Sequence, residues 1–168
     1  EKAQDLRYGE NPHQAAAFYK ERGAQSGLAA AQQLHGKELS FNNLVDLEAA
    51  YAVAVDFPQP AAAIIKHTNP CGTGMGATLA DAYRKAHSAD PVSAFGGIVG
   101  LNREVDAETA GELSAIFLEA VIAPSYTKEA LDILSQKKNI RLLAAPLPKQ
   151  GHKEWDIKKV SGGLLLQE

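Results

Sequence analysis

The chain has 168 residues, 45% of them apolar, so it is long enough for one sizeable core and too short for two ordinary domains. Its 17 basic and 20 acidic residues give a net charge of -3 and form no basic block, which argues against a nucleic-acid partner. Its single cysteine, Cys71, leaves no partner for an internal disulfide, and because no apolar run approaches about 18 residues we expect a soluble, cytoplasmic protein with no membrane partner.

The first polar segment of the chain is LRYGENPHQ, at residues 6–14. Its glycine and proline, set among polar side chains, predict an irregular loop. Arg7 in this loop offers a planar fork suited to a phosphate or a carboxylate. A solvated arm near the beginning of the chain explains the same composition, so residues 6–14 alone do not decide between the two.

The second polar segment, GKELSFNNLVD at residues 36–46, lies directly before a predicted helix at 46–56. Free backbone N–H groups at a helix start favour an anion, and Lys37 lies close by. Ordinary N-capping by Asn43 or Asp46 explains the segment equally well, and Asp46 is the expected N-cap.

A short apolar strand predicted at 61–65 ends with Lys66 and His67 side by side, before an Asn-Pro pair that predicts a loop. A lysine at the end of a buried strand is easily desolvated, and a histidine titrates near neutrality. Such a pair can move protons and stabilise developing negative charge. The alternative is a surface lysine beside a histidine that only bonds the turn at Asn69.

The rest of the chain continues the alternation of helices and strands. Helices are predicted at 78–87 with Thr78 as the cap, at 107–118 and at 127–136, and strands at 94–100, 120–123 and 140–145. Such alternation favours βαβ units. We therefore expect an α/β fold in three layers, with a sheet covered by helices.

Glycines follow an aromatic residue in the segment DPVSAFGGIVG at 90–100, where Phe95 precedes Gly96 and Gly97. Glycines allow the backbone to approach a ligand closely. A β-bulge or bend with Phe95 in the core explains the same residues.

Four segments, taken together and in this order, closely resemble the signature segments of the AICAR transformylase domain of the bifunctional purine-biosynthesis enzyme: LRYGENPHQ, GKELSFNNLVD, IIKHTNPCG and DPVSAFGGIV. The resemblance runs from about Asp5 to the end of the chain, because VIAPSYTKEALDIL and VSGGLLLQ are also similar to that family. It implies a cytidine-deaminase-like subdomain. It also implies a formyltransferase that passes the formyl group of 10-formyltetrahydrofolate to aminoimidazole carboxamide ribotide (AICAR) in IMP biosynthesis.

The resemblance further implies roles for individual residues. Lys66 and His67 match the catalytic Lys-His pair of the family. There the histidine handles the proton of the attacking amine, and the lysine steadies charge on the formyl oxygen or the leaving folate nitrogen. The positions that match nucleotide-binding or pocket residues are Arg7 (toward the phosphate), Tyr8, Asn43, Phe95, Gly96 and Glu119 (near the ribose or the folate).

The family's transformylase domain has two similar halves, and residues 1–168 resemble only the first; nothing in the chain resembles the cyclohydrolase domain. We therefore expect no IMP cyclisation and a fragment that is not fully active by itself. The three leucines near residue 165 also indicate a chain that stops within a larger unit. In the complete enzyme we expect a homodimer with the active site at the interface.

Two alternatives come from other classes of protein. A zinc hydrolase of the deaminase type needs H-x-E and P-C-x-x-C segments. Here His67 is followed by Thr68 and Asn69, and no second cysteine follows Cys71, so we expect no metal in this half. A non-catalytic half that binds nucleotide or supports dimerisation remains open.

Overall fold

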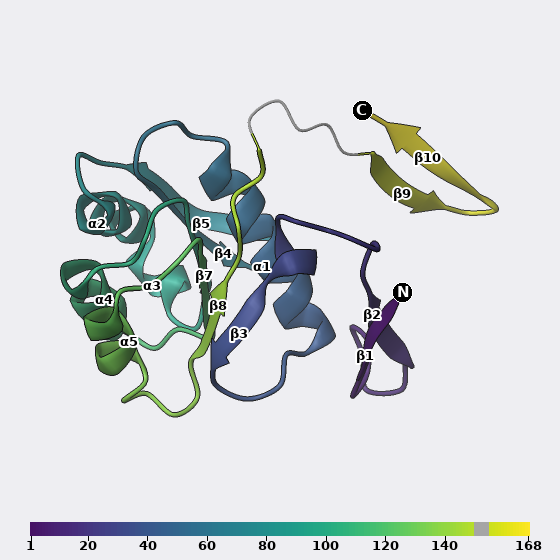
Figure 1. Ribbon diagram of the computed structural model, residues 1–168, viewed down its shortest axis with the longest axis horizontal. Helices are drawn as coiled ribbons and strands as arrows, with labels where there is room; N and C mark the ends of the chain where they lie inside the picture. Colours follow the sequence, from purple (N-terminus) through teal and green to yellow (C-terminus); the bar gives the residue numbers. More distant parts are fainter. Residues whose placement is uncertain (150–154) are drawn as a thin grey trace.

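A six-stranded mixed sheet forms the centre of the computed structural model, which describes residues 1–149 and 155–168 (Figure 1). In spatial order its strands are β3 (Gln32–His35), β8 (Arg141–Ala144), β7 (Ala120–Ala123), β6 (Ile98–Leu101), β4 (Ala61–Lys66) and β5 (Asn69–Met75). Strands β6, β7 and β8 run parallel. The other three strands are antiparallel to their neighbours.

Helices cover both faces of this sheet. On one face α1 (Phe41–Val55) buries Leu47 and Tyr51 against Ile65 and Ile122. The other face carries α2 (Leu79–Ala89), α4 (Ala107–Ser114) and α5 (Lys128–Leu134), whose apolar residues pack on the alternate side chains of the same strands. The predicted three-layer α/β architecture is confirmed, while the likeness to cytidine deaminases stays a prediction.

Helix α1 begins at Phe41, before the predicted residue 46, because Ser40 and Asn43 close a capping box. Asn43 N–H donates to Ser40 Oγ at 3.1 Å, and Ser40 N–H donates to Asn43 Oδ1 at 3.1 Å. The prediction of Asp46 as N-cap is therefore wrong. The N-cap is Ser40, so Asn43 is not the N-cap either; its side chain completes the capping box from the third position of the helix.

Several other helices and strands lie close to the residues at which the sequence predicts them. Strand β7 has the predicted bounds, β4 extends one residue further to Lys66, and α2 is capped by Thr78 as predicted. Helices α4 and α5 are shorter than predicted but begin at the expected places. The predicted strand at 94–100 is wrong in its first part, since the short helix α3 (Pro91–Ala94) lies there and β6 starts only at Ile98.

The loop predicted at Asn69 and Pro70 is instead the start of β5, an edge strand. Only two residues, His67 and Thr68, separate β5 from β4. Proline is tolerated here because an edge strand does not need every backbone N–H for pairing. The chain therefore turns back at once after Lys66 and forms a hairpin.

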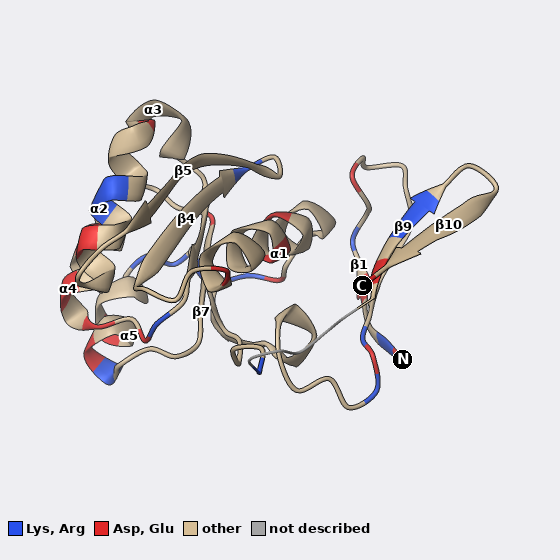
Figure 2. Ribbon diagram, turned by 90° about the horizontal axis from the view of Figure 1, so that it is seen from above, with Lys and Arg blue, Asp and Glu red and all other residues tan. Residues whose placement is uncertain are grey.

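Two further hairpins lie outside the central sheet: β1 (Lys2–Leu6) with β2 (Ala16–Tyr19), and β9 (Asp156–Val160) with β10 (Gly163–Gln167). The predicted irregular loop at 6–14 is confirmed from residue 7 onward, as the connection between β1 and β2. A short 3-10 turn, Leu28–Ala30, leads into β3. Figure 2 shows charges along the outer helices α2, α4 and α5, whereas β10 carries none along most of its length.

No helix among residues 1–149 and 155–168 is both long enough and apolar enough to cross a membrane.

Candidate functional site

One edge of the sheet gathers most of the predicted site residues. Strand β4 runs antiparallel to β6, while β6, β7 and β8 are parallel, so β4 ends where the other three begin. Lys66 is the last residue of β4, Gly96 precedes β6, Glu119 precedes β7, and Arg141 opens β8. Residues distant in the sequence therefore lie at one place in the fold.

The Lys-His pair lies at the turn of the β4–β5 hairpin. Lys66 pairs with Asn69 across the turn, and the two residues between them have positive φ angles, 53° at His67 and 62° at Thr68. Lys66 as a whole is half-buried, and its ammonium donates to the carbonyl of Phe95 at 3.0 Å in an exposed hydrogen bond. The His67 side chain is exposed, and within the described residues its imidazole has no hydrogen-bond partner.

The alternative interpretation of this pair, a surface lysine beside a histidine that only bonds the turn at Asn69, is only partly confirmed. The polar contacts within the turn go to the backbone carbonyl of His67. Asn69 Nδ2 donates to the carbonyl of His67 at 2.8 Å, and Thr68 Oγ1 donates to the same carbonyl at 2.7 Å. The imidazole ring takes no part in these bonds. It therefore stays available to a ligand at the surface.

Asp46 is a site residue that the sequence interpretation missed. Its carboxylate accepts the backbone N–H of Thr68 at 2.7 Å and that of His67 at 3.3 Å. The contact joins the second turn of α1 to hairpin residues that lie 21 and 22 positions further along the chain. No local pattern predicts such a pairing.

Phe95 and Gly96 form the entry to β6. The Phe95 side chain is 58% exposed, so the alternative prediction that Phe95 lies in the core is wrong. The reason is that α3 ends with the buried Ala94 and directs the next residue outward. The ring centre of Phe95 lies 5.5 Å from that of Phe117. Gly96 has a φ of 74° and donates its N–H to the carbonyl of Phe117 at 2.8 Å.

Two titratable groups lie near Lys66. The pKa of the Asp90 carboxyl is lowered, chiefly by hydrogen bonds from Ser93 and to a smaller extent by the charge of Lys66. The pKa of the Cys71 thiol is raised, chiefly by burial. A raised pKa disfavours the thiolate, so Cys71 is a poor nucleophile in this environment.

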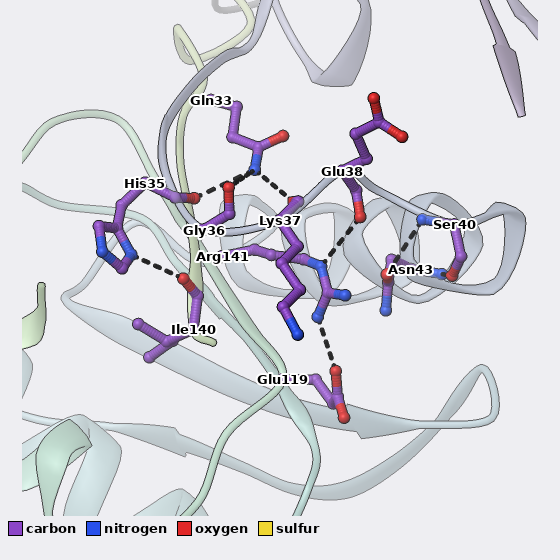
Figure 3. Close-up of polar contacts among 10 residues, drawn as sticks. All are labelled: Gln33, His35, Gly36, Lys37, Glu38, Ser40, Asn43, Glu119, Ile140 and Arg141. Atoms are coloured by element: carbon purple, nitrogen blue, oxygen red, sulfur yellow. Dashed lines mark hydrogen bonds and ion pairs between the residues drawn. The ribbon is translucent and has the colours of Figure 1, made fainter. Parts of the chain in front are cut away.

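Glu119 is engaged by Arg141 (Figure 3). The Arg141 guanidinium bonds Glu119 Oε2 through Nη1 at 2.7 Å and donates from Nε to the carbonyl of Glu38 at 3.3 Å. The Arg141 side chain is only 15% exposed, so this ion pair is partly protected from solvent. The sequence interpretation missed Arg141, although a charged residue opening an otherwise apolar strand was a usable signal.

A fixed loop carries Lys37 to the same edge (Figure 3). Gln33 Nε2 donates to the carbonyls of His35, Gly36 and Lys37 at 3.1, 3.2 and 2.7 Å. His35 Nδ1 contacts the carbonyl of Ile140 at 2.9 Å. Gly36 has a φ of 94°, and a Cβ there would lie 2.3 Å from the Ile140 oxygen, so only glycine fits.

A pocket of about 550 Å³ opens where this loop meets the β1–β2 hairpin. Its polar lining includes Arg7, Tyr8, Lys37 and Arg141, and the Arg7 guanidinium lies 5.7 Å from the Tyr8 ring centre. In the described part of the chain neither Arg7 nor Lys37 forms an ion pair, whereas the lining carboxylate of Asp5 is paired with Lys2. The carboxylate of Glu38 also lines the pocket, so the three cationic side chains outnumber the two carboxylates by one, an excess of positive charge that suits an anion.

The structure thus brings Arg7 and Tyr8 together with Lys37 and Arg141 around one pocket. Four other predicted site residues do not line this pocket and lie along the same sheet edge toward β4 and β6: Lys66, His67, Phe95 and Gly96. Asn43 also stays outside the lining, and its side-chain oxygen is used by the capping box. Helix α1 links the two groups, since its cap faces the pocket and Asp46 holds the hairpin turn.

A larger cavity of about 800 Å³ lies between β2, the residues around Gly27 and the first turns of α1. Its lining is mostly apolar, with Phe18, Leu28, Phe41 and Leu44 among the residues, and it contains none of the predicted site residues. Among the residues that the structure describes, no group of three or more His, Cys, Asp or Glu side chains could hold a metal ion.

The whole chain, residues 1–168, matches the protein family described as AICARFT/IMPCHase bienzyme. Three curated relatives are each called bifunctional purine biosynthesis protein PurH. The protein from Halalkalibacterium halodurans is 57% identical over 169 residues, that from Thermoanaerobacter sp. 58% over 169, and that from Sorangium cellulosum 60% over 173. Each alignment covers 100% of this chain and 33% of the relative, so the chain spans about a third of their length.

Proposed function

Because the chain belongs to the AICARFT/IMPCHase bienzyme family, we propose that it is the first half of the family's AICAR transformylase domain and contributes the reacting Lys-His pair. The proposed reaction moves a formyl group from 10-formyltetrahydrofolate to the 5-amino group of AICAR. The observation that carries the proposal is the exposed His67 imidazole, directly after Lys66 in the chain, at the sheet edge that also bears the cationic pocket.

The reaction requires two proton transfers, one from the attacking amine and one to the leaving folate nitrogen, while the formyl carbon exchanges one C–N bond for another. The amine nitrogen of AICAR attacks the formyl carbon and loses a proton, and the bond from that carbon to folate N10 then breaks while N10 gains a proton. His67 can accept the first proton and return it to the leaving nitrogen. The positive charge of Lys66 can stabilise the oxyanion that forms between the two steps.

The nucleotide would occupy the cationic side of this edge. Arg7 and Lys37 offer positive charge to a phosphate, and Tyr8 lies against Arg7. Phe95 and Gly96 would line the path toward His67, with Asn43 near the start of α1. Glu119, oriented by Arg141, offers a carboxylate oxygen to a ribose hydroxyl or to the folate.

The chain is proposed to act with partners that complete the site. His67 and the pocket face solvent, so water is not excluded from the reaction centre by the described residues alone. In the proposed assembly the second half of the domain and a second copy of the enzyme close the site. No metal takes part in this scheme.

A chimera tests the proposal. This chain replaces the matching third of the Halalkalibacterium halodurans relative, to which it is 57% identical, and formylation of AICAR is followed by the appearance of tetrahydrofolate. We expect turnover in the chimera and a loss of roughly 10²- to 10⁴-fold in kcat on His67→Ala, because the positioned proton acceptor is removed. Turnover of His67→Ala within twofold of the chimera would contradict the proposed role.

Nucleotide binding is tested separately, on the chain itself, by calorimetric titration with AICAR. Arg7→Ala should weaken binding by about 10-fold or more, because a charge-assisted contact to phosphate is lost. Arg22→Ala is the matched control, since its side chain is 87% exposed and it lies outside the pocket. Binding that depends on Arg7, together with an inactive chimera, would favour the alternative of a non-catalytic, nucleotide-binding half.

A further inference from the structure

The turn that carries His67 has an unfavourable backbone conformation. Two-residue hairpin turns with positive φ at both positions favour Asn and Gly, but here the positions are held by His67 and Thr68, at φ 53° and 62°. Histidine tolerates this region moderately well, whereas a β-branched residue rarely adopts it. Such strain persists only where the surrounding structure holds it, and it occurs often at functional sites.

Bonds inside the turn do not fix its place in the molecule. The side chains of Thr68 and Asn69 both donate to the carbonyl of His67, so they stabilise the bend itself. Lys66 reaches the carbonyl of Phe95, but through a long, flexible side chain. The backbone of the turn needs a further contact to a rigid element if the imidazole is to keep one position.

Asp46 supplies that contact. Its two carboxylate oxygens separately accept the N–H groups of Thr68 (2.7 Å) and His67 (3.3 Å), so both strained residues are bound at once. Hydrogen bonds to a charged acceptor are stronger than bonds between neutral groups. Asp46 is itself held firmly, because it precedes the fully buried Leu47 in a helix that starts with a capping box.

We propose that Asp46 is a positioning residue that holds the strained His67–Thr68 turn, and with it the His67 imidazole, in the geometry needed for formyl transfer. The inference rests on the function proposed above. Asp46 touches neither substrate nor reacting atoms in this scheme. It acts only through the backbone of the turn.

Hydrogen exchange on the chain without substrate tests the clamp independently of the reaction. Asp46→Ala should raise the exchange rates of the His67 and Thr68 amides by about 10-fold or more, since both lose their acceptor. Asp46→Asn keeps one acceptor oxygen and should give an intermediate change. Asp132→Ala, in α5 on the opposite face of the sheet, is the matched control.

Turnover of the chimera tests the consequence. We expect Asp46→Ala to lower kcat by roughly 10- to 100-fold, as a displaced catalytic group does, with the KM for AICAR within about twofold of the parent. Adding Thr68→Gly should restore most of the lost kcat, because glycine adopts a positive φ without strain and needs the clamp less. A helix that had merely lost stability would not be rescued in this way.

The outcomes separate the two proposals. Unchanged amide exchange in Asp46→Ala overturns the clamp, whatever the reaction. Changed exchange with kcat within twofold of the parent, while His67→Ala is inactive, overturns the positioning role and leaves the proposed function standing. A His67→Ala chimera that stays active counts against the proposed function. If adding Asp46→Ala to that His67→Ala chimera still lowers kcat, Asp46 does not act through His67, and this inference fails too.

Discussion

Asn102 joins backbone groups that no strand pairing satisfies. The side chain is 1% exposed; its Oδ1 accepts the N–H of Ala61 at 2.8 Å, and its Nδ2 donates to the carbonyls of Phe57 and Gln59 at 2.8 and 2.7 Å. One side chain thereby fixes the loop that leads from α1 into β4. The position of Lys66 at the far end of β4 depends on that entry.

Asn102→Ala should lower the free energy of unfolding by about 2 to 4 kcal/mol, because buried backbone groups lose their partners. Urea denaturation of the chain, followed by circular dichroism, measures the loss. Asn102→Asp is an informative companion, since it keeps an acceptor for Ala61 but has no amide to donate to Phe57 and Gln59. A change below about 0.5 kcal/mol for the alanine variant would show that water replaces the bonds at no cost.

Among the elements, helix α1 approaches the sheet closely where β6 carries Gly100. A Cβ at this position would lie 2.1 Å from the carbonyl oxygen of Ala50, a distance that real atoms do not adopt. The glycine therefore sets the separation between α1 and the strands. That separation also sets how Asp46 meets the hairpin turn.

Gly100→Ala should destabilise the chain by about 1 to 3 kcal/mol, since the helix must move off the sheet or the strand must bend. Gly111→Ala is the matched control in α4, where a Cβ would meet nothing within 4 Å. It should be neutral or stabilising by up to about 1 kcal/mol, because alanine is the better helix former. Equal thermal midpoints for the two variants would refute the close approach of α1.

Helix α4 begins with an N-cap whose charge state matters. Asp106 accepts the N–H of Thr109 at 2.8 Å, and this bond lowers the pKa of the Asp106 carboxyl below its usual value. A carboxyl with a lower pKa in the folded than in the unfolded state stabilises the fold above the unfolded pKa, about 4. The contribution disappears as the pH falls through the folded pKa.

Asp106→Asn should therefore change the pH dependence of the unfolding free energy and leave the helix cap itself in place, because asparagine is an equally good N-cap without a titrating group. We expect wild type and variant to differ most in unfolding free energy above pH of about 4, and to converge at lower pH. Urea denaturation at a series of pH values measures this. A difference that grows as the pH falls would contradict the stated sign.

Local signals explain which elements the sequence predicted. The apolar runs of β4 and β7 and the Thr78 cap of α2 carry their information within a few residues, and those elements lie where predicted. Strand β5 contains glycines and a proline and packs closely under α2, so its composition resembles a loop. Its pairing with β4 fixes it as a strand, and composition does not report pairing.

The candidate site shows the same limit. The Lys66–His67 pair was visible as two neighbouring polar residues after an apolar run, and Arg7 as a cation in a polar loop. The partners that hold the site come from distant segments, with Asp46 meeting Thr68 and Arg141 meeting Glu119. Those contacts depend on the order of the strands, which periodicity alone does not determine.

On the scale of the whole molecule, the described chain consists of a packed sheet-and-helix body with two hairpins outside the sheet (Figure 1). The β1–β2 hairpin contributes Arg7 and Tyr8 to the cationic pocket through the loop that follows β1. The β9–β10 hairpin instead exposes apolar side chains, with Leu164, Leu165 and Leu166 between 57% and 60% exposed. A two-stranded hairpin by itself is marginally stable, so β9–β10 should add little to the stability of this chain.

A matched pair of leucines tests this. Leu142→Ala, in β8, an inner strand of the six-stranded sheet, and 0% exposed, should cost about 2 to 5 kcal/mol of unfolding free energy, because it leaves a cavity. Leu164→Ala, in β10 and 60% exposed, should stay within about 0.5 kcal/mol of the wild type when the chain is unfolded by urea. Repeating Leu164→Ala in the chimera then separates two arrangements. If Leu164→Ala lowers the unfolding free energy only in the chimera, the rest of the enzyme covers the hairpin. If it already lowers the unfolding free energy of this chain, β10 packs against the described core.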